Sequence, residues 1–245
     1  MRMSKLKSPK RRFFGMILKY AIRQSNFMEL QVEHLKKGID KLQKIYGNAE
    51  LKSIYGAGCI SNPEILFLFM NPTARNISSL PNWKGIRAPW IGTKNIWKLF
   101  YSLDILSFDI FREIQENGHK IWNEKFAKNI YDSLNKESVY VTNLAKCTQD
   151  NARALKNVVF KAYLKSTKEE IYDVNPKKII SFGNQVSSIL LDRNIKVSEY
   201  KKQKKEVVNI NDKIFDVYPV YYPIGQGLRN INKAIRRIKD ILRGT

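Results

Sequence analysis

The stretch that decides the fold is residues 65–101, ILFLFMNPTARNISSLPNWKGIRAPWIGTKNIWKLFY. It opens with the unbroken apolar run 65–70, which has the length and composition of a β-strand buried on both faces. Asn71-Pro72 ends that strand, because proline cannot extend the ladder and also restricts the residue before it. In open α/β sheets, ligands bind at the carboxyl ends of the strands. The side chain of Asn71 is therefore predicted to lie at a binding edge.

The residues after the strand predict a pocket loop followed by a helix. Glycines and prolines alternate with Trp83 and Trp90, which is typical of an ordered loop that lines a pocket. Thr93 is the predicted N-cap of a helix that carries Trp97 and Phe100. We assign Trp97 to the core, because its spacing with Phe100 places both on one helical face.

The charge of the chain indicates what kind of partner the protein binds. There are 44 Lys and Arg residues against 22 Asp and Glu, so the formal net charge is +22. A polyanion is implied, and we favour nucleic acid over an anionic membrane surface because the lysines are spread through the chain. A lysine-rich proteome is the alternative explanation. The length suits one domain over 1–245, with a basic extension at 1–12, and we expect a monomer.

The cysteines and histidines predict no metal and no cofactor. Cys59 and Cys147 are too few for a cysteine-ligated cluster or a four-cysteine zinc site. His34 and His119 stand far apart among polar neighbours, so we expect both on the surface. The apolar segment near the start is interrupted at Lys19 without a following cleavage site, and no run is long enough to cross a bilayer. We therefore expect a cytoplasmic protein.

The rest of the chain repeats a strand-turn-helix pattern. Strand-like runs at 139–142 and 178–182 are followed by polar or glycine turns, and two further β-like runs lie at 207–210 and 214–222. This repetition predicts an α/β fold, a three-layer sandwich with a central, mostly parallel four-stranded sheet and helices on both faces. The predicted helices cover 13–23, 29–46, 109–117, 121–134, 154–172, 185–191 and 230–242.

Five short motifs carry a resemblance. They are FMNPT at 69–73, GIRAPWIG at 85–92, YVTNLAKC at 140–147, NPKKIISFGNQVSSILL at 175–191 and VYPVYYPIGQGLRN at 217–230. In order and spacing they resemble the uracil-DNA glycosylase superfamily, over roughly residues 65–242. FMNPT is similar to the Asn-Pro first motif of the mismatch-specific and single-strand-selective branches, whereas YVTNLAKC is similar to the iron-sulfur branch. The resemblance implies an enzyme that flips uracil or a related deaminated base out of DNA and hydrolyses its N-glycosidic bond.

The resemblance also implies roles for single residues. Asn71 would position the hydrolytic water, which its amide oxygen can do by accepting a hydrogen bond. Met70, Trp90 and Asn143 would bind the substrate, with Trp90 stacking on the flipped base. Asn143 would read the base edge, because one amide offers both a donor and an acceptor and so tells uracil from cytosine. The second catalytic position is Tyr222, which stands where most branches have histidine.

The segment after Tyr222 is the implied loop that enters the duplex. Its glycines permit close approach to phosphate, Leu228 is a candidate apolar wedge, and Arg229 is a candidate phosphate contact. The predicted DNA-binding residues are Gly225, Gln226, Gly227, Leu228 and Arg229. The cluster cysteines of the iron-sulfur branch are missing here, so no cluster is expected.

Each of these residues also has an ordinary structural explanation. Asn71 and Asn143 are turn-forming residues after strands, Trp90 is a candidate core residue, and Tyr222 lies among strand tyrosines. Two functions follow. The first is a DNA glycosylase, and the alternative is a non-catalytic nucleic-acid-binding protein that keeps the glycosylase fold but lost its activity with the histidine.

Overall fold

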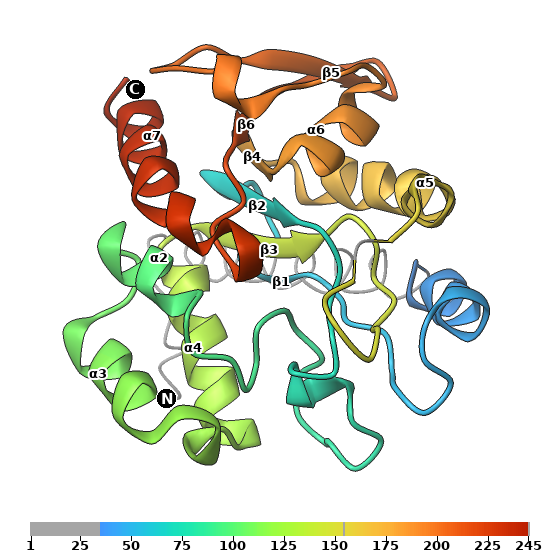
Figure 1. Ribbon diagram of the computed structural model, residues 1–245, viewed down its shortest axis with the longest axis vertical. Helices are drawn as coiled ribbons and strands as arrows, with labels where there is room; N and C mark the ends of the chain where they lie inside the picture. Colours follow the sequence, from blue (N-terminus) through green and yellow to red (C-terminus); the bar gives the residue numbers. More distant parts are fainter. Residues whose placement is uncertain (1–34, 154, 245) are drawn as a thin grey trace, which may run out of the picture.

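A computed structural model describes residues 35–153 and 155–244 (Figure 1). The predicted basic extension at 1–12, the predicted helix at 13–23 and the start of the helix predicted at 29–46 lie outside these residues. Within them, 35–46 is helical as predicted.

The centre of the fold is one mostly parallel sheet. Its strands are β1 (Ala57–Gly58), β2 (Ile65–Phe69), β3 (Val139–Asn143), β4 (Lys178–Phe182), β5 (Glu206–Ile210) and β6 (Lys213–Val220). The strand order is β1-β3-β2-β4-β6-β5. The four inner strands are parallel, and β1 and β5 pair antiparallel at the two edges.

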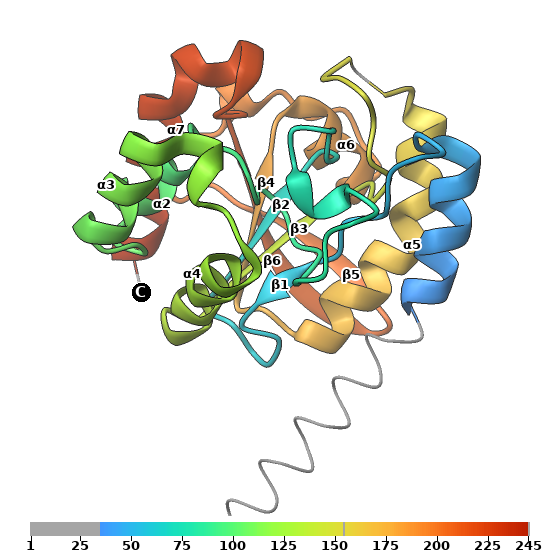
Figure 2. The same cartoon turned by 90° about the horizontal axis from the view of Figure 1, so that it is seen from below.

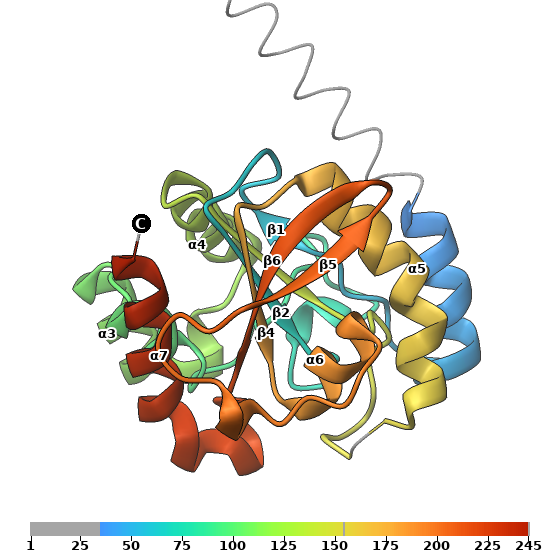
Figure 3. The same cartoon turned by 90° about the horizontal axis from the view of Figure 1, so that it is seen from above.

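The predicted count of four strands is therefore wrong, since the sheet has six. The edge strand β1 contains two residues, too few to leave a hydrophobic pattern in the sequence. The strand β5 joins β6 through Asn211 and Asp212, which both have positive φ, of 48° and 63°. Two such residues make the tight turn that matches the twist of a hairpin. The β5–β6 hairpin is seen most clearly in Figure 3.

The helices follow the predicted positions with shifted ends. They are α2 (Trp97–Ser102), α3 (Phe108–Asn117), α4 (Glu124–Lys136), α5 (Asn157–Val174), α6 (Asn184–Leu191) and α7 (Ile231–Arg243), with 3-10 helices η1 (Ile77–Ser79), η2 (Gly118–Ile121), η3 (Val197–Glu199) and η4 (Gly225–Asn230).

Thr93 does not cap a helix, contrary to prediction, because its side chain is engaged elsewhere. Its hydroxyl donates to the carbonyl of Trp90 at 2.6 Å, and α2 begins after Ile96.

Two hydrophobic clusters use the alternating side chains of β2. All five residues of this strand are buried, as predicted for a strand covered on both faces. Phe67 and Phe69 belong to one cluster with residues of α2, α4 and α7, whereas Leu66 and Leu68 belong to a second cluster with residues of α5 and α6. Figures 1 and 2 accordingly show α4 and α7 on one side of the strands and α5 on the other.

The registers bring the carboxyl ends of the inner strands to one edge of the sheet. Phe69 is paired with Asn143 across β2 and β3, and Phe182 is paired with Val220 across β4 and β6. The segments that begin at Asn71, Leu144, Gly183 and Tyr221 therefore all leave the sheet at this edge. None of the helices in 35–153 and 155–244 is long and apolar enough to cross a membrane.

Candidate active site

The ring of Phe69, the last residue of β2, lies at the centre of the predicted site. It stacks on Phe182 with ring centroids 4.4 Å apart. The rings of Trp90 and Tyr222 meet it edge to face, at 5.0 and 6.4 Å between centroids. Two predicted site residues that are far apart in the sequence thus surround one ring. Asn143 joins the same neighbourhood as the register partner of Phe69.

The side chain of Asn143 is buried and has no partner. The residue is 1% exposed. Neither Nδ2 nor Oδ1 makes a hydrogen bond within the described residues. A buried amide without partners costs free energy, and such groups are rare in folded proteins. A ligand with a complementary donor and acceptor would satisfy both atoms at once. The amide is therefore the clearest sign of a binding site in this structure.

Trp90 is held in an unusual backbone conformation. Its φ is 71°, in the left-handed region that a bulky side chain rarely adopts, and strain of this kind gathers at functional sites. The Trp90 carbonyl accepts from both the hydroxyl and the backbone N–H of Thr93, which closes a turn. The indole N–H of Trp90 is buried without a partner among the described residues, but the indoles of Trp97 and Trp122 share this property. The backbone of Trp90 is thus more informative than its N–H.

Asn71 lies just beyond β2 and is half-buried. Its Nδ2 donates to the carbonyl of Pro72 at 3.1 Å. This bond uses one of the two N–H donors of the amide and leaves the oxygen available to accept a hydrogen bond. An acceptor at this edge is what the positioning of a water requires.

The side chain of Met70 lies apart from the other predicted substrate-binding residues. It packs with the second cluster, whereas Trp90 and Tyr222 pack with the first. The backbone carbonyl of Met70 accepts from the N–H of Ala145, which ties the end of β2 to the segment after β3. A direct contact of Met70 with substrate stays a prediction.

Tyr222 is half-buried beside Phe69. Burial raises the pKa of its phenol well above the ordinary value, so the hydroxyl keeps its proton and remains a neutral donor. Two glycines lie against this residue. A Cβ at Gly227 would lie 2.1 Å from the Tyr222 carbonyl oxygen, and one at Gly183 would lie 3.5 Å from the Tyr222 Cβ. Gly227 is therefore required for the close approach of the next segment.

The predicted duplex-entering loop is a 3-10 helix, η4, which leads directly into α7. The segment predicted to enter the duplex is thus helical, and its entry into DNA stays a prediction. Gly225, Gln226, Leu228 and Arg229 are exposed, and Leu228 is 42% exposed. An exposed leucine between a glycine and an arginine is compatible with a wedge.

One of the basic residues of α7 is buried. Arg237 is 5% exposed, and its guanidinium donates to the carbonyls of Pro219, Lys202 and Lys204 at 2.8 to 3.0 Å. It therefore fixes the lysine-rich segment 201–205 against the end of β6 instead of facing solvent. Arg236 remains exposed and Lys239 is half-buried.

Sequence reasoning missed a buried ion pair next to Asn143. Lys146 and Glu170 are both buried, and their charged atoms are 2.5 Å apart. Burial lowers the pKa of the Lys146 ammonium, while the Glu170 carboxylate acts to raise it. A lysine inside the apolar segment 139–147 was the available signal.

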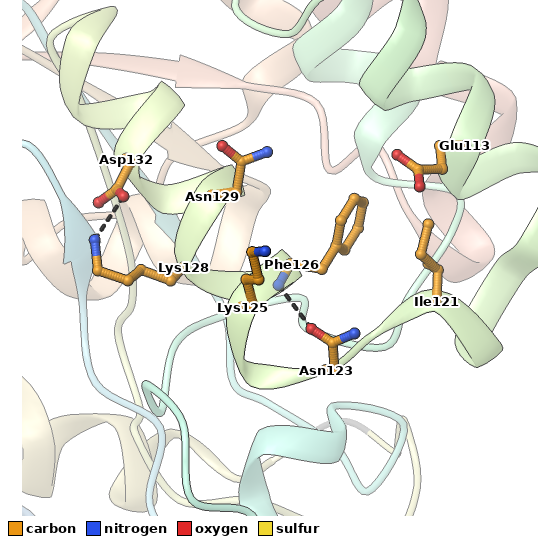
Figure 4. A pocket seen from close by; sticks show the side chains of 8 residues that line it. All are labelled: Glu113, Ile121, Asn123, Lys125, Phe126, Lys128, Asn129 and Asp132. Carbon is orange, nitrogen blue, oxygen red and sulfur yellow. Dashed lines mark hydrogen bonds and ion pairs between the residues drawn. The ribbon is translucent and has the colours of Figure 1, made fainter.

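Two pockets can be compared with the position of the predicted site. The larger, of about 460 Å³, lies between α3, η2 and α4 and contains none of the predicted site residues (Figure 4). In this view Phe126 and Ile121 face Glu113, while Lys128 pairs with Asp132 at 2.6 Å. The smaller, of about 270 Å³, is lined by Tyr222 and also by Gly183, Asn184, Ser198, Tyr221, Gly227 and Asn230. Of the predicted site residues, Tyr222 and Gly227 therefore line an open hollow.

The described residues contain no group of three or more His, Cys, Asp or Glu that could hold a metal ion. Cys59 and Cys147 are free thiols, and Cys147 is buried. His119 is exposed, as predicted, and His34 lies outside the described residues.

No protein-family model matches the chain, and no curated protein matches its sequence. The resemblance to the uracil-DNA glycosylase superfamily therefore stays a prediction, and the function rests on the residues at the carboxyl edge of the sheet.

Proposed function

We propose that the protein is a DNA glycosylase that flips uracil or a related deaminated base out of DNA and hydrolyses its N-glycosidic bond. An abasic site is the product. The observation that carries the proposal is the unpartnered, buried amide of Asn143 at the carboxyl edge of the sheet. A pyrimidine edge offers the acceptor and the donor that such an amide lacks.

The chemistry divides between two ends of the scissile bond. Cleavage passes through a sugar with cationic character, so a water must be held near the sugar and negative charge on the leaving base must be stabilised. The free amide oxygen of Asn71 suits the first task. The neutral phenol of Tyr222 suits the second, because it can donate one hydrogen bond to the developing anion without changing its own charge.

The remaining features support DNA as the substrate. The net charge of +22 favours a phosphate backbone, and the exposed Leu228 and Arg229 follow Tyr222 at the position of a wedge. Trp90, strained and set against Phe69, is the proposed stacking partner of the flipped base. The proposal includes a three-layer α/β sandwich, no cofactor, and a monomer in the cytoplasm.

Tyr222 in place of histidine favours a second candidate function. A phenol is a weaker donor than an imidazolium, so loss of histidine would suit a protein that binds nucleic acid without cleaving it. Both candidates share the fold, the charge and the Asn143 amide. They differ only in whether the protein cleaves the N-glycosidic bond.

One experiment separates the two functions. Purified protein is incubated with oligonucleotides that carry uracil, hypoxanthine or a T·G mismatch, and alkali then breaks the strand at any abasic site. We expect breaks at uracil with the parent protein, far fewer in the same time with Asn71→Ala, and none with an undamaged oligonucleotide. If the parent makes no breaks and Tyr222→His does, the binding protein is the correct function.

A further inference from the structure

The carbonyl of Asn143 is held by the buried pair of Lys146 and Glu170. Lys146 follows β3 and is fully buried, and Glu170 comes from α5 and is 3% exposed. Figure 2 shows α5 on the side of the strands away from α4. Taking two charges out of water is expensive, and an apolar pair of the same size is often equally stable. A pair in this place therefore calls for a purpose other than stability.

The hydrogen bonds of the pair converge on one point of the backbone. The Lys146 ammonium donates to the carboxylate of Glu170 at 2.5 Å, to the hydroxyl of Thr142 at 2.7 Å and to the backbone carbonyl of Asn143. All three of its protons are used. The ammonium thus clamps the peptide group of the residue whose side chain has no partner of its own.

The carboxylate of Glu170, at the other end of the pair, also has several hydrogen-bond partners. Glu170 also accepts from the hydroxyls of Tyr140 and Thr142, at 2.8 and 3.0 Å. Tyr140 and Thr142 are two residues apart on β3, so their side chains point to the same face of the strand. The network is anchored in the strand and in α5 at once, which makes it rigid.

The side chain of Asn143 depends on this clamp for its position. Because its amide atoms make no hydrogen bond, no contact of that kind fixes its orientation. Its backbone is fixed by the Lys146 contact and by the bonds from Leu144 and Ala145 to the carbonyls of Phe69 and Met70, and the position of the side chain follows from that of the backbone. An amide that reads a base must be placed within a fraction of an ångström, and misplacement by about 1 Å costs about 10²-fold in rate.

We propose that Lys146 and Glu170 are positioning residues that set the orientation of the Asn143 amide and thereby its selectivity for the base. The identity of the ligand in this inference rests on the proposed function, whereas the placement of the amide is independent of that function. The pair touches no substrate itself. It acts through the peptide group of Asn143.

The test compares a double variant with the parent. Lys146→Met combined with Glu170→Gln removes both buried charges, and the glutamine keeps an acceptor for Tyr140 and Thr142. The matched control is Lys128→Met with Asp132→Asn, which removes an ion pair from the exposed face of α4. Thermal denaturation confirms that both variants fold. Either single substitution would leave one buried charge without its partner, so neither is used alone.

The first readout needs no substrate. In the free parent, the side-chain NH₂ of Asn143 is expected to give one sharp pair of ¹H–¹⁵N signals, assigned through Asn143→Asp. In the folded double variant these signals should broaden or split, and in the control they should not move. An unchanged Asn143 signal in the double variant would overturn the inference.

The second readout is the ratio of single-turnover rates on uracil and cytosine in the same sequence. We expect this ratio to fall about tenfold to a hundredfold in the double variant and to stay constant in the control. An active double variant with the parental ratio overturns the claim on selectivity. If the parent itself cleaves nothing, the proposed function fails, while the change in the Asn143 signals still decides the positioning role.

Discussion

Two asparagines of the described chain are buried to nearly the same extent, and they differ completely in their partners. Asn76, 3% exposed, donates to the carbonyl of Ala88 at 2.8 Å and accepts from the N–H and the hydroxyl of Ser78. Asn143, 1% exposed, makes no hydrogen bond with its side chain. Burial alone therefore does not identify a site. The missing partners do, because folding tolerates an unsatisfied buried group only where something else is gained.

The largest effect that separates the two asparagines is expected in activity. Asn143→Leu removes the base-reading amide at almost constant volume, and we expect the single-turnover rate on uracil to fall by about 10²–10³-fold, as for loss of one preorganised donor. Asn76→Leu, measured at a temperature where it is folded, should lose less than about tenfold. Equal losses in the two variants would remove the distinction between them.

Asn71 extends the comparison to a partly satisfied amide. Asn71→Ala deletes the acceptor for the water, so the chemical step should slow by about 10²-fold while binding to abasic-site DNA changes little. Single-turnover kinetics and a binding titration measure the two quantities separately. A variant that cleaves at the parental rate would end the assignment of Asn71.

Stability should separate the same two asparagines in the opposite sense. Asn76→Leu leaves the buried Ser78 N–H without its acceptor and takes one of two hydrogen bonds from the Ala88 carbonyl, so we expect the free energy of unfolding to fall by about 2 kcal/mol or more. Asn143→Leu removes a group that has no partner to lose, so its free energy of unfolding should be unchanged or higher by about 1 kcal/mol. Denaturant titration of both variants measures the difference. A large destabilisation by Asn143→Leu would indicate a structural partner for its amide.

The smallest expected effect concerns pH. Because burial raises the pKa of Tyr222, its hydroxyl stays protonated, and the parent rate should be flat up to about pH 10, where a free phenol titrates. In Tyr222→His the rate should rise as the pH falls through about 6.5, because the imidazolium is the stronger donor to a leaving anion. A parent rate that falls between about pH 7 and 9 would show that another group controls the step.

The sequence predicted those features whose signal is local. The apolar run 65–70 predicted β2, and Asn71 and Asn143 lie at the carboxyl ends of β2 and β3, where the sequence predicted them. The prediction that Thr93 caps a helix was wrong, because its hydroxyl closes the turn at Trp90 instead. The edge strand β1 was missed, since it has two residues and depends on pairing with β3, whereas the edge strand β5 lies at the predicted β-like run 207–210.

Features fixed by tertiary contacts were beyond the sequence. Lys146 and Glu170 are 24 residues apart, and only the packing of α5 against the sheet brings them together. Arg237 has the same residue type as its exposed neighbour Arg236, and its burial depends on three carbonyls supplied by other segments. The missing partners of Asn143 likewise become visible only in three dimensions.

The most direct test of the Asn143 amide replaces its NH₂ group with an oxygen and keeps the shape of the side chain. Asn143→Asp replaces the amide donor with a second acceptor, which suits the amino group of cytosine and repels the carbonyl of uracil. The measurement is the ratio of single-turnover cleavage rates on uracil and cytosine, placed opposite the same base in the same oligonucleotide. We predict a ratio strongly in favour of uracil for the parent and a much smaller ratio for Asn143→Asp, with cleavage at cytosine gained. An unchanged ratio, or no release of either base by the parent, would contradict the reading of the base by Asn143.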